Sequence, residues 1–181
     1  MPFFSMAGAA PKVAAVGDAP ARLNEQAFHL FYERTARPLH RYLLRMVNDT
    51  TAADDLLQES YLRLLKARLP RDASDEHLKN YLFRIATNLV KDRRTAWREM
   101  AIEADIAAAK TAPFDGDVRR LMAALKPKQR DLLWLAYVEC FSHKEIAAML
   151  KLRPHSIRPL LSRARRAFAE VLKRGGFGEV K

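Results

Sequence analysis

The chain has 181 residues, a length that suits one ordinary domain or two compact helical domains joined by a linker. Apolar residues make up 49% of the sequence, which excludes a disordered chain, and no uncharged apolar run approaches the ~20 residues of a membrane span, so membrane insertion is not expected. The formal net charge of +11 favours a polyanionic partner, nucleic acid first, and argues against an ordinary metabolic enzyme.

The distribution of glycine predicts an all-α chain. Only 6 glycines occur, and Gly175, Gly176 and Gly178 lie close to the end, which leaves few hairpin turns for strands. Residues 1–23 are expected to form a disordered tail, because no basic segment precedes their apolar part as it would in a targeting sequence. Residues 175–181 are expected to form a flexible tail.

Residues 24–99 are predicted to form a first unit of three helices. Asn24 is expected to cap the first helix, whose apolar face resumes past Pro38. Asn48 and Asp49 are expected to end it, because polar turn-forming residues interrupt the helical spacing of the apolar ones there.

The second and third helices are expected on either side of a loop. Thr51 and Asp54 have the spacing of a capping box and are expected to start the second helix, which ends near Ala67. Residues 68–77 have the composition of a loop. A third helix is predicted from about Leu78, because large apolar residues recur there at helical spacing before the sequence becomes strongly basic.

A second unit is predicted at residues 117–174, after a linker at residues 100–116 that is poor in large apolar side chains. Because this linker has little to bury, the two units are expected to move independently in the free protein. Pro127 suits the first position of a helix, and Ser142 with Glu145 forms a capping box that starts a shorter helix. The predicted fold is therefore all-α, with two small helical domains joined by a linker.

The end of the second unit is predicted to be a helix-turn-helix. A short helix, a three-residue connection and a last helix with a basic outer face follow one another after Ser142. The segment from Arg153 to Arg174 contains seven basic residues and one acid, Glu170, which gives a net charge of +6. This concentration favours contact with DNA in the major groove over a basic face that is merely solvated.

Pro159 affects where the last helix is expected to begin. In a helix that began at Pro154, Pro159 would lack the hydrogen bond to the carbonyl of His155 and would clash with it. With Ser156 as N-cap, Pro159 would instead lie in the first turn, where proline is tolerated. The regular helix is therefore expected to begin only after Ser156.

A second basic segment lies on the predicted third helix. Its cations are Lys79, Arg84, Lys91, Arg93, Arg94 and Arg98, with Asp92 as the one opposing acid. Phe83, Asn88 and Trp97 are interleaved with them, and such side chains can stack on unpaired bases or bond to base edges. Tyr81 is expected in the core, whereas Phe83 and Trp97 have less obvious structural roles.

No arrangement of residues predicts catalysis, a metal or a cofactor. The 5 histidines, His29, His40, His77, His143 and His155, are scattered without the paired spacing of zinc ligands, and no glycine-rich phosphate loop occurs. The single cysteine, Cys140, cannot form an internal disulfide, which fits a reducing, cytoplasmic setting, and it is expected to be a small buried side chain.

Two sets of motifs carry a resemblance to a known family. The sequences DDLLQESYLRL (residues 54–64), YLFRIATNL (81–89) and DRR (92–94) resemble domain 2 of bacterial RNA polymerase sigma factors of the extracytoplasmic-function (ECF) group, in the sigma-70 family. The sequences LKPKQR (125–130), FSHKEIA (141–147) and LSRARR (161–166) resemble domain 4 of the same proteins. The resemblance covers roughly residues 25–98 and 117–173, in the order of the family.

The resemblance implies an initiation factor, not an enzyme, that binds core RNA polymerase and directs promoter recognition, DNA melting and transcription initiation. It implies that core polymerase binds Asp54, Asp55, Gln58 and Glu59, although Asp54 and Asp55 would also stabilise a helix N-terminus. It assigns contacts with the −10 element to Arg71, Lys79, Arg84, Asn88 and Lys91. It assigns contacts with the −35 element to Arg153, His155, Ser156, Arg158, Ser162, Arg163, Arg165 and Arg166.

By the same resemblance, the linker around Glu103 and Asp105 would enter the active-site channel of the polymerase, and an anti-sigma factor is a candidate further partner. Lys151, Arg153, Pro154 and Pro159 depart from the usual pattern of the helix-turn-helix. Two alternatives stay open. An autonomous DNA-binding regulator would bind promoter DNA without polymerase, and a sigma mimic that sequesters a regulator is supported only by Pro159.

Overall fold

The computed structural model describes residues 25–70, 73–100 and 116–175, with side chains left out at 98–100 and 116–119. Every regular element in the described ranges is an α-helix, as the sequence predicts. The helices are α1 (Glu25–Val47), α2 (Thr50–Lys66), α3 (Asp75–Met100), α4 (Gly116–Ala123), α5 (Pro127–Tyr137), α6 (His143–Leu150) and α7 (Pro154–Arg174). None of these helices is both long and apolar enough to cross a lipid bilayer.

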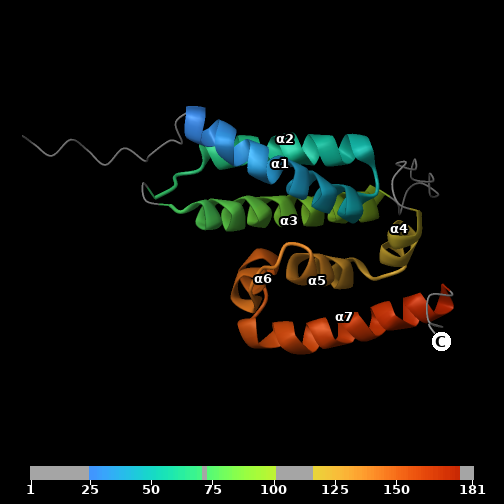
Figure 1. Cartoon of the computed structure of the whole chain (residues 1–181). Coiled ribbons are helices and arrows are strands. Elements are labelled where there is room, and N and C mark those ends of the chain that lie inside the picture. Colours follow the sequence, from blue (N-terminus) through green and yellow to red (C-terminus); the bar gives the residue numbers. More distant parts are fainter. Residues whose placement is uncertain (1–24, 71–72, 101–115, 176–181) are drawn as a thin grey trace, which may run out of the picture.

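Helices α1, α2 and α3 form an N-terminal unit, and α4 to α7 form a C-terminal unit (Figure 1). Helix α3 lies between the α1–α2 pair and the α5–α6 pair, and α7 covers the far side of α5 and α6. The predicted N-terminal tail, most of the predicted C-terminal tail and residues 101–115 of the predicted linker lie outside the described residues.

The N-terminal unit is held by large apolar side chains at helical spacing. Leu39, Tyr42 and Leu43 of α1 are fully buried, and α1 continues through Pro38 as one helix. A buried hydrogen bond of 2.7 Å joins the hydroxyls of Thr35 and Tyr61 and ties α1 to α2. Burial raises the pKa of Tyr61 to about 12, although the hydrogen bond with Thr35 acts in the opposite direction.

Two helix starts in this unit differ from the predicted ones. The capping box of Thr51 and Asp54 is wrong: Asp49 is the N-cap of α2, and its Oδ1 accepts a hydrogen bond of 2.8 Å from the Ala52 N–H. Asp49 caps α2 because the chain already turns at Asn48, whose φ is 57°. The third helix, α3, likewise begins at Asp75 rather than near Leu78.

The starts of α5 and α6 agree with the sequence prediction. Pro127 is the first residue of α5. The Ser142 N–H donates to Glu145 Oε2 at 2.7 Å, and the Glu145 N–H donates to Ser142 Oγ at 3.3 Å, which completes the capping box of α6. Lys151 then takes a left-handed conformation with φ of 54°, and this turn directs the chain into α7.

The predicted start of the last helix is wrong. Helix α7 begins at Pro154 with Arg153 as its N-cap, so Ser156 is a residue of the first turn whose N–H donates to the Arg153 carbonyl at 2.9 Å. Proline at the first helical position is pre-organised for a helix, which favours this start. Pro159 therefore lies inside α7, and His155, whose carbonyl loses an N–H partner, is exposed to water.

Two expectations about single side chains are also corrected. Phe83 is fully buried, with its ring 5.7 Å from that of Tyr42 and 5.1 Å from that of Phe141, so it belongs to the core rather than to a surface that could stack on bases. Cys140 is exposed and not buried. Its backbone turns with φ of 59° between Glu139 and Phe141, and both of these neighbours point inward.

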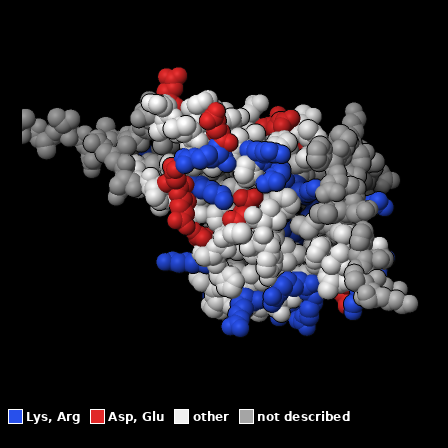
Figure 2. All heavy atoms as spheres, viewed as in Figure 1, with Lys and Arg blue, Asp and Glu red and all other residues white. Residues whose placement is uncertain are grey.

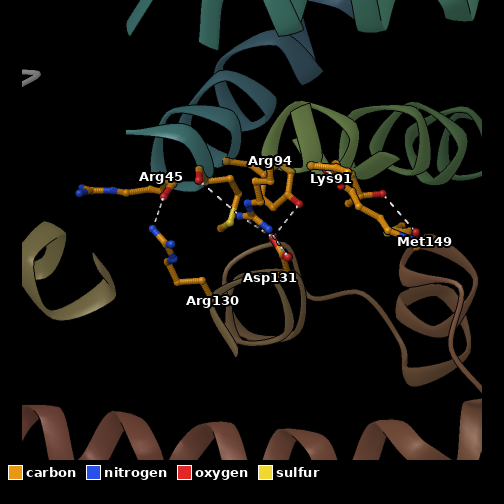
Figure 3. Close-up of polar contacts among 10 residues, drawn as sticks. Arg45, Lys91, Arg94, Arg130, Asp131 and Met149 are labelled. Carbon is orange, nitrogen blue, oxygen red and sulfur yellow. Dashed lines mark hydrogen bonds and ion pairs between the residues drawn. The ribbon is translucent and has the colours of Figure 1, made fainter. Parts of the chain in front are cut away.

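The two units pack against each other, whereas the composition of the linker predicted that they would move independently. Helix α3 packs along α6, and Phe83 and Phe141 join the two apolar cores. Figure 3 shows Arg94 and Asp131 pointing toward each other across the interface, with 2.9 Å between Nη1 and Oδ2. The expectation of independent movement used the composition of the linker alone and missed the residues that join the units elsewhere.

Candidate nucleic-acid interface and acidic turn

The outer face of α7 carries a row of exposed basic side chains. Ile157, Leu161 and Ala164 are buried against α5 and α6, which fixes the rotation of the helix. The exposed side chains include six of those that the sequence assigned to the −35 element, namely Arg153, His155, Arg158, Arg163, Arg165 and Arg166, whereas Ser156 and Ser162 are half-buried. In the view of Figure 2, lysine and arginine predominate along the lower edge, where α7 lies.

None of these arginines forms an ion pair with any residue that the structure describes. A solvated row of guanidinium groups at the start of a helix, presented by the tight turn at Lys151, can enter a groove and bond to phosphate and base edges. The arrangement is therefore a surface for a polyanion.

The basic face of α3 is divided between solvent and the C-terminal unit. Arg84 is exposed, with its guanidinium 4.7 Å from the centre of the Tyr81 ring, and Lys91 is exposed about two turns further along the same side of α3. Half-buried Asn88 donates to the Arg84 carbonyl at 2.7 Å. Lys79 instead points at the C-terminal unit. Arg71, the remaining residue assigned to the −10 element, lies outside the described residues.

A cavity of about 520 Å³ lies beside the contact of α3 with α6, lined by Tyr81 and Arg84 from α3 and by Lys144 and Glu145 from α6. Burial alone would raise the pKa of Glu145, but hydrogen bonds from Ser142 and Asn80 and the charge of Lys79 lower it below its ordinary value. The carboxylate is thus held in its charged form beside α3.

Trp97 is a further aromatic side chain at the far end of α3. It is 43% exposed, and the Arg93 guanidinium lies 5.2 Å from the centre of its ring. Unlike Phe83, this side chain agrees with the expectation of an aromatic group outside the core, available for stacking.

The four polar residues assigned to core polymerase lie on the outer side of α2. Asp54, Asp55 and Gln58 are exposed and Glu59 is half-buried. Asp54 Oδ1 lies 2.9 Å from His40 Nε2, and Glu59 Oε1 lies 2.6 Å from Arg63 Nε.

Asp55 and Gln58 form no side-chain hydrogen bond or ion pair with any described residue. Because α2 begins at Thr50, Asp54 and Asp55 lie beyond its first turn, where the helix dipole has faded. Stabilisation of the helix end therefore explains these acids less well than contact with a partner.

The sequence prediction missed two apolar residues that lie beside the four polar residues of α2. Leu62 and Leu65 on the next turns of α2 are 49% and 42% exposed. Leu62 is four residues after Gln58 and Leu65 is seven, and both spacings would have placed the leucines on the side of the helix that holds Gln58. Together they make a surface with an apolar patch beside negative charge, which suits a protein partner better than nucleic acid.

A polar cluster at the interface between the units was also missed. Tyr42 donates to Asp131 Oδ1 at 3.3 Å, and Arg94 donates to Asp131 and to the Met46 carbonyl. Burial, followed by the charge of Asp131, raises the pKa of Tyr42 well above its ordinary value. The residues lie far apart in the sequence, and the one signal was that Asp131 is the single acid of α5, directly before its apolar run.

Arg130 completes this cluster with Nη1 donating to the Arg45 carbonyl at 3.4 Å. Burial lowers the pKa of Arg130, repulsion from Arg94 lowers it further, and Asp131 offsets part of the effect. Among the described side chains, no group of three potential metal ligands comes together.

Comparisons with known proteins match both units of the chain. The sigma-70 region 2 family matches residues 31–99, and the sigma-70 region 4 family matches residues 115–168. The chain is 30% identical over 158 residues to RNA polymerase sigma factor CarQ of Myxococcus xanthus, a match that covers 82% of this chain and 90% of CarQ. It is 26% identical to ECF RNA polymerase sigma factor SigM of Bacillus subtilis, over 80% of this chain and 94% of SigM.

Solved structures share the fold. The sigma factor RpoE of Bartonella quintana, in complex with the anti-sigma factor NepR, matches with a TM-score of 0.68 and 22% identity over 82% of this chain and 98% of that one. CnrH, in complex with the cytosolic domain of CnrY, matches with a TM-score of 0.61 and 23% identity over 83% of this chain and 90% of that one.

Proposed function

Because the chain belongs to the ECF group of the sigma-70 family of RNA polymerase sigma factors, we propose that it uses two separate surfaces to initiate transcription. The acidic side of α2 binds core RNA polymerase, and the basic faces of α3 and α7 bind promoter DNA. Sigma factors are initiation factors, so the chemistry of RNA synthesis stays with the polymerase and this chain supplies the choice of promoter.

The observation that carries this proposal is the separation of charge between α2 and α7. Asp55 and Gln58 have no described partner in their own chain, and neither do Arg163 and Arg166 at the opposite side of the molecule. A protein that bound only DNA would need the second set but not the first. Two opposite, unpaired surfaces fit a chain that bridges a protein and a polyanion.

We assign the roles by unit. Residues 24–99 would hold the polymerase contacts Asp54, Asp55, Gln58 and Glu59 and the −10 contacts Arg71, Lys79, Arg84, Asn88 and Lys91. Residues 117–174 would hold the −35 contacts Arg153, His155, Ser156, Arg158, Ser162, Arg163, Arg165 and Arg166. The half-buried Ser156 and Ser162 sit between exposed arginines, where a hydroxyl can bond to a phosphate that the arginines hold.

Regulation by an anti-sigma factor is part of the proposal. RpoE and CnrH, which share the fold, are each described in complex with such a regulator or with the cytosolic domain of a partner protein. A partner of this kind would act on the cytoplasmic side, where the polymerase works. The exposed apolar side chains Leu62 and Leu65 of α2 are available to it as well as to the polymerase.

A mobility-shift assay with and without core polymerase tests this function against that of an autonomous regulator. We expect promoter fragments to shift only when chain and polymerase are both present. A specific shift by the chain alone, unchanged by polymerase, would assign the chain to the class of autonomous DNA-binding regulators.

A further inference from the structure

A cavity of about 310 Å³ lies where α1 and α3 meet α4 and α5. Its walls include three arginines, one indole and two apolar side chains, namely Arg93, Arg94, Arg130, Trp97, Met46 and Val47. The arginines come from both units, two from α3 and one from α5. Among the described residues that line the cavity, none is an acid, and Pro127 places the positive end of the α5 dipole at its wall. The cavity is therefore a positively charged space that the two units build together.

The charges around this cavity are not balanced within the described part of the chain. Asp131 pairs with Arg94, with 2.9 Å between Oδ2 and Nη1. The Arg93 side chain forms no hydrogen bond or ion pair with any described residue, and Arg130 donates to the Arg45 carbonyl at 3.4 Å (Figure 3). Burial and repulsion from Arg94 lower the pKa of Arg130, and Asp131 offsets only part of that effect. Three cations therefore share one carboxylate.

Two of the arginines carry buried donors without an acceptor. Arg93 Nε and Arg130 Nε are buried, and neither has a hydrogen-bond partner among the described residues. An N–H group that stays unpaired away from water costs free energy, so two such donors beside one cavity call for an acceptor. Because no bond of the chain fixes either Nε, a small turn of the side chain presents it to an anion in the cavity. A guanidinium bonds to carboxylate and phosphate through a planar fork of N–H groups, which favours an anion with several oxygens.

Trp97 gives the cavity an aromatic wall beside these donors. Its side chain is 43% exposed, and the Arg93 guanidinium lies 5.2 Å from the centre of its ring. A planar base can stack on an exposed indole while a neighbouring arginine holds a phosphate. A volume of about 310 Å³ is at the lower end of the range for small-molecule sites, which suits a single nucleotide better than a polymer. The combination of arginines and indole favours an anion that carries an aromatic ring.

We propose that this cavity binds a nucleoside monophosphate, with the phosphate between Arg93 and Arg130 and the base on Trp97. The phosphate dianion balances the two guanidinium groups that lack an acid, and its oxygens accept from their unpaired N–H groups. Because Arg93 belongs to the N-terminal unit and Arg130 to the C-terminal one, a single bound phosphate joins the two units. The inference goes beyond the proposed function, since the site contains none of the residues assigned to core polymerase or promoter DNA.

Titration of the free full-length chain with the 5′-monophosphates of adenosine, guanosine, cytidine and uridine tests the site. At about pH 8 a phosphate monoester carries both of its charges, because its second pKa is about 6. Isothermal titration calorimetry measures the affinity, and we expect saturable binding of at least one of these nucleotides, with one molecule per chain. If none of them binds, the proposal is wrong.

Tryptophan fluorescence shows whether the base stacks where the proposal places it. The chain contains 2 tryptophans, and Trp134 is only 8% exposed, so a stacked base should quench the emission of Trp97. The quenching should saturate at the same nucleotide concentration as the heat of binding and should disappear in Trp97→Phe. Quenching that persists unchanged in Trp97→Phe would place the base elsewhere and contradict the proposal.

Single substitutions test the two arginines. Arg93→Gln and Arg130→Gln should each weaken nucleotide binding by about 10- to 100-fold, the effect of losing one charged hydrogen-bond partner. Arg93→Lys keeps the charge but loses the planar fork, so it should recover part of the affinity. Arg37→Gln, exposed on α1 and outside the lining of the cavity, makes the same change in net charge and should bind like wild type.

Circular dichroism checks that each variant folds. If Arg130→Gln does not fold, Arg93→Gln carries the same test from the other unit. An affinity of either folded glutamine variant equal to that of Arg37→Gln would overturn the site.

Three further probes identify the source of the phosphate. Inorganic phosphate and the nucleoside without phosphate should each bind about tenfold more weakly than the nucleotide, or weaker still, because each lacks one of the two contacts. A single-stranded oligodeoxynucleotide without a terminal phosphate should bind Arg130→Gln and Arg37→Gln alike. Inorganic phosphate that binds as tightly as the nucleotide would exclude a role for the base. An equal loss of nucleotide and oligonucleotide binding in Arg130→Gln would assign the cavity to nucleic acid and overturn the proposal.

Discussion

Arg94 of α3 and Asp131 of α5 form an ion pair across the two units, with 2.9 Å between Nη1 and Oδ2. Their side chains are 23% and 11% exposed, and the Tyr42 hydroxyl adds a hydrogen bond from α1 to the same carboxylate. All the described partners of the Asp131 side chain belong to the other unit. The Asp131 side chain therefore stabilises the packing of the two units and not the folding of α5.

Asp131→Asn should loosen the units without unfolding them. Asparagine keeps the shape but loses the charge that Arg94 pairs with, and hydrogen bonds to charged groups contribute about 1.5–3 kcal/mol each. We expect a larger radius of gyration by small-angle X-ray scattering and faster proteolytic cleavage between α3 and α4. Asp92→Asn, an exposed acid on α3, is the matched control. A compact Asp131→Asn variant would show that the apolar contacts alone hold the units together.

Reversing the charge of Asp55 and Glu59 should abolish binding to core polymerase. The two carboxylates lie one turn apart on the outer side of α2, and neither is buried, so lysine at both positions should leave the fold intact. Co-purification with core polymerase measures the effect, and circular dichroism checks the fold. Glu33→Lys on α1 controls for the change in net charge. The docking assignment fails if the double variant is retained on core polymerase as strongly as wild type.

Arg163→Ala should weaken the binding of holoenzyme to promoter DNA. The side chain is exposed on α7 and has no ion-pair partner among the described residues, so its loss costs little stability. If it bonds to a guanine edge, the loss is on the order of 1–3 kcal/mol and confined to promoters with that base. If it contacts phosphate, all promoters weaken alike and the salt slope falls by about 0.9. Unchanged binding to every promoter would remove Arg163 from the interface.

Acidification should destabilise the packing of α6 on α3. The pKa of Glu145 is lowered from 4.5 in the folded chain, so its charged form contributes stability that is present above about pH 4.5 and lost as the pH falls through the lowered value. We expect the melting temperature to fall below that pH, and to fall less in Glu145→Gln. Lys79, Ser142 and Asn80 are the groups that hold the charge. Identical pH profiles for both proteins would show that another carboxylate governs the acid transition.

The helices and most of their ends follow from local sequence signals. The capping box of Ser142 and Glu145, the start at Pro127 and the all-α class were each predicted, because caps and proline act over a few residues. At Asp49 and Ser156 two local signals competed, and sequence alone did not say which would prevail. Helix α7 begins at Pro154 although Pro159 then lies inside it, because water can bond to the His155 carbonyl that loses its N–H partner in the exposed first turn.

The contacts between the units could not be predicted from the same signals. Phe83 was expected outside the core because α3 has a core side of its own, and only the packing of Phe141 shows why a second apolar face is buried. Asp131 and Arg94 are 37 residues apart, and no periodicity links positions across a linker. The acidic and basic surfaces were predictable because each lies on one helix, where spacing determines which side chains share a face.

Run-off transcription with purified core polymerase on genomic fragments measures whether this chain initiates transcription at promoters. We expect discrete transcripts that require this chain, start at a limited set of promoters, and disappear when Asp55 and Glu59 are both replaced by lysine. The absence of any chain-dependent transcript, in a preparation whose chain still binds the polymerase and whose polymerase is active with another initiation factor, would contradict it.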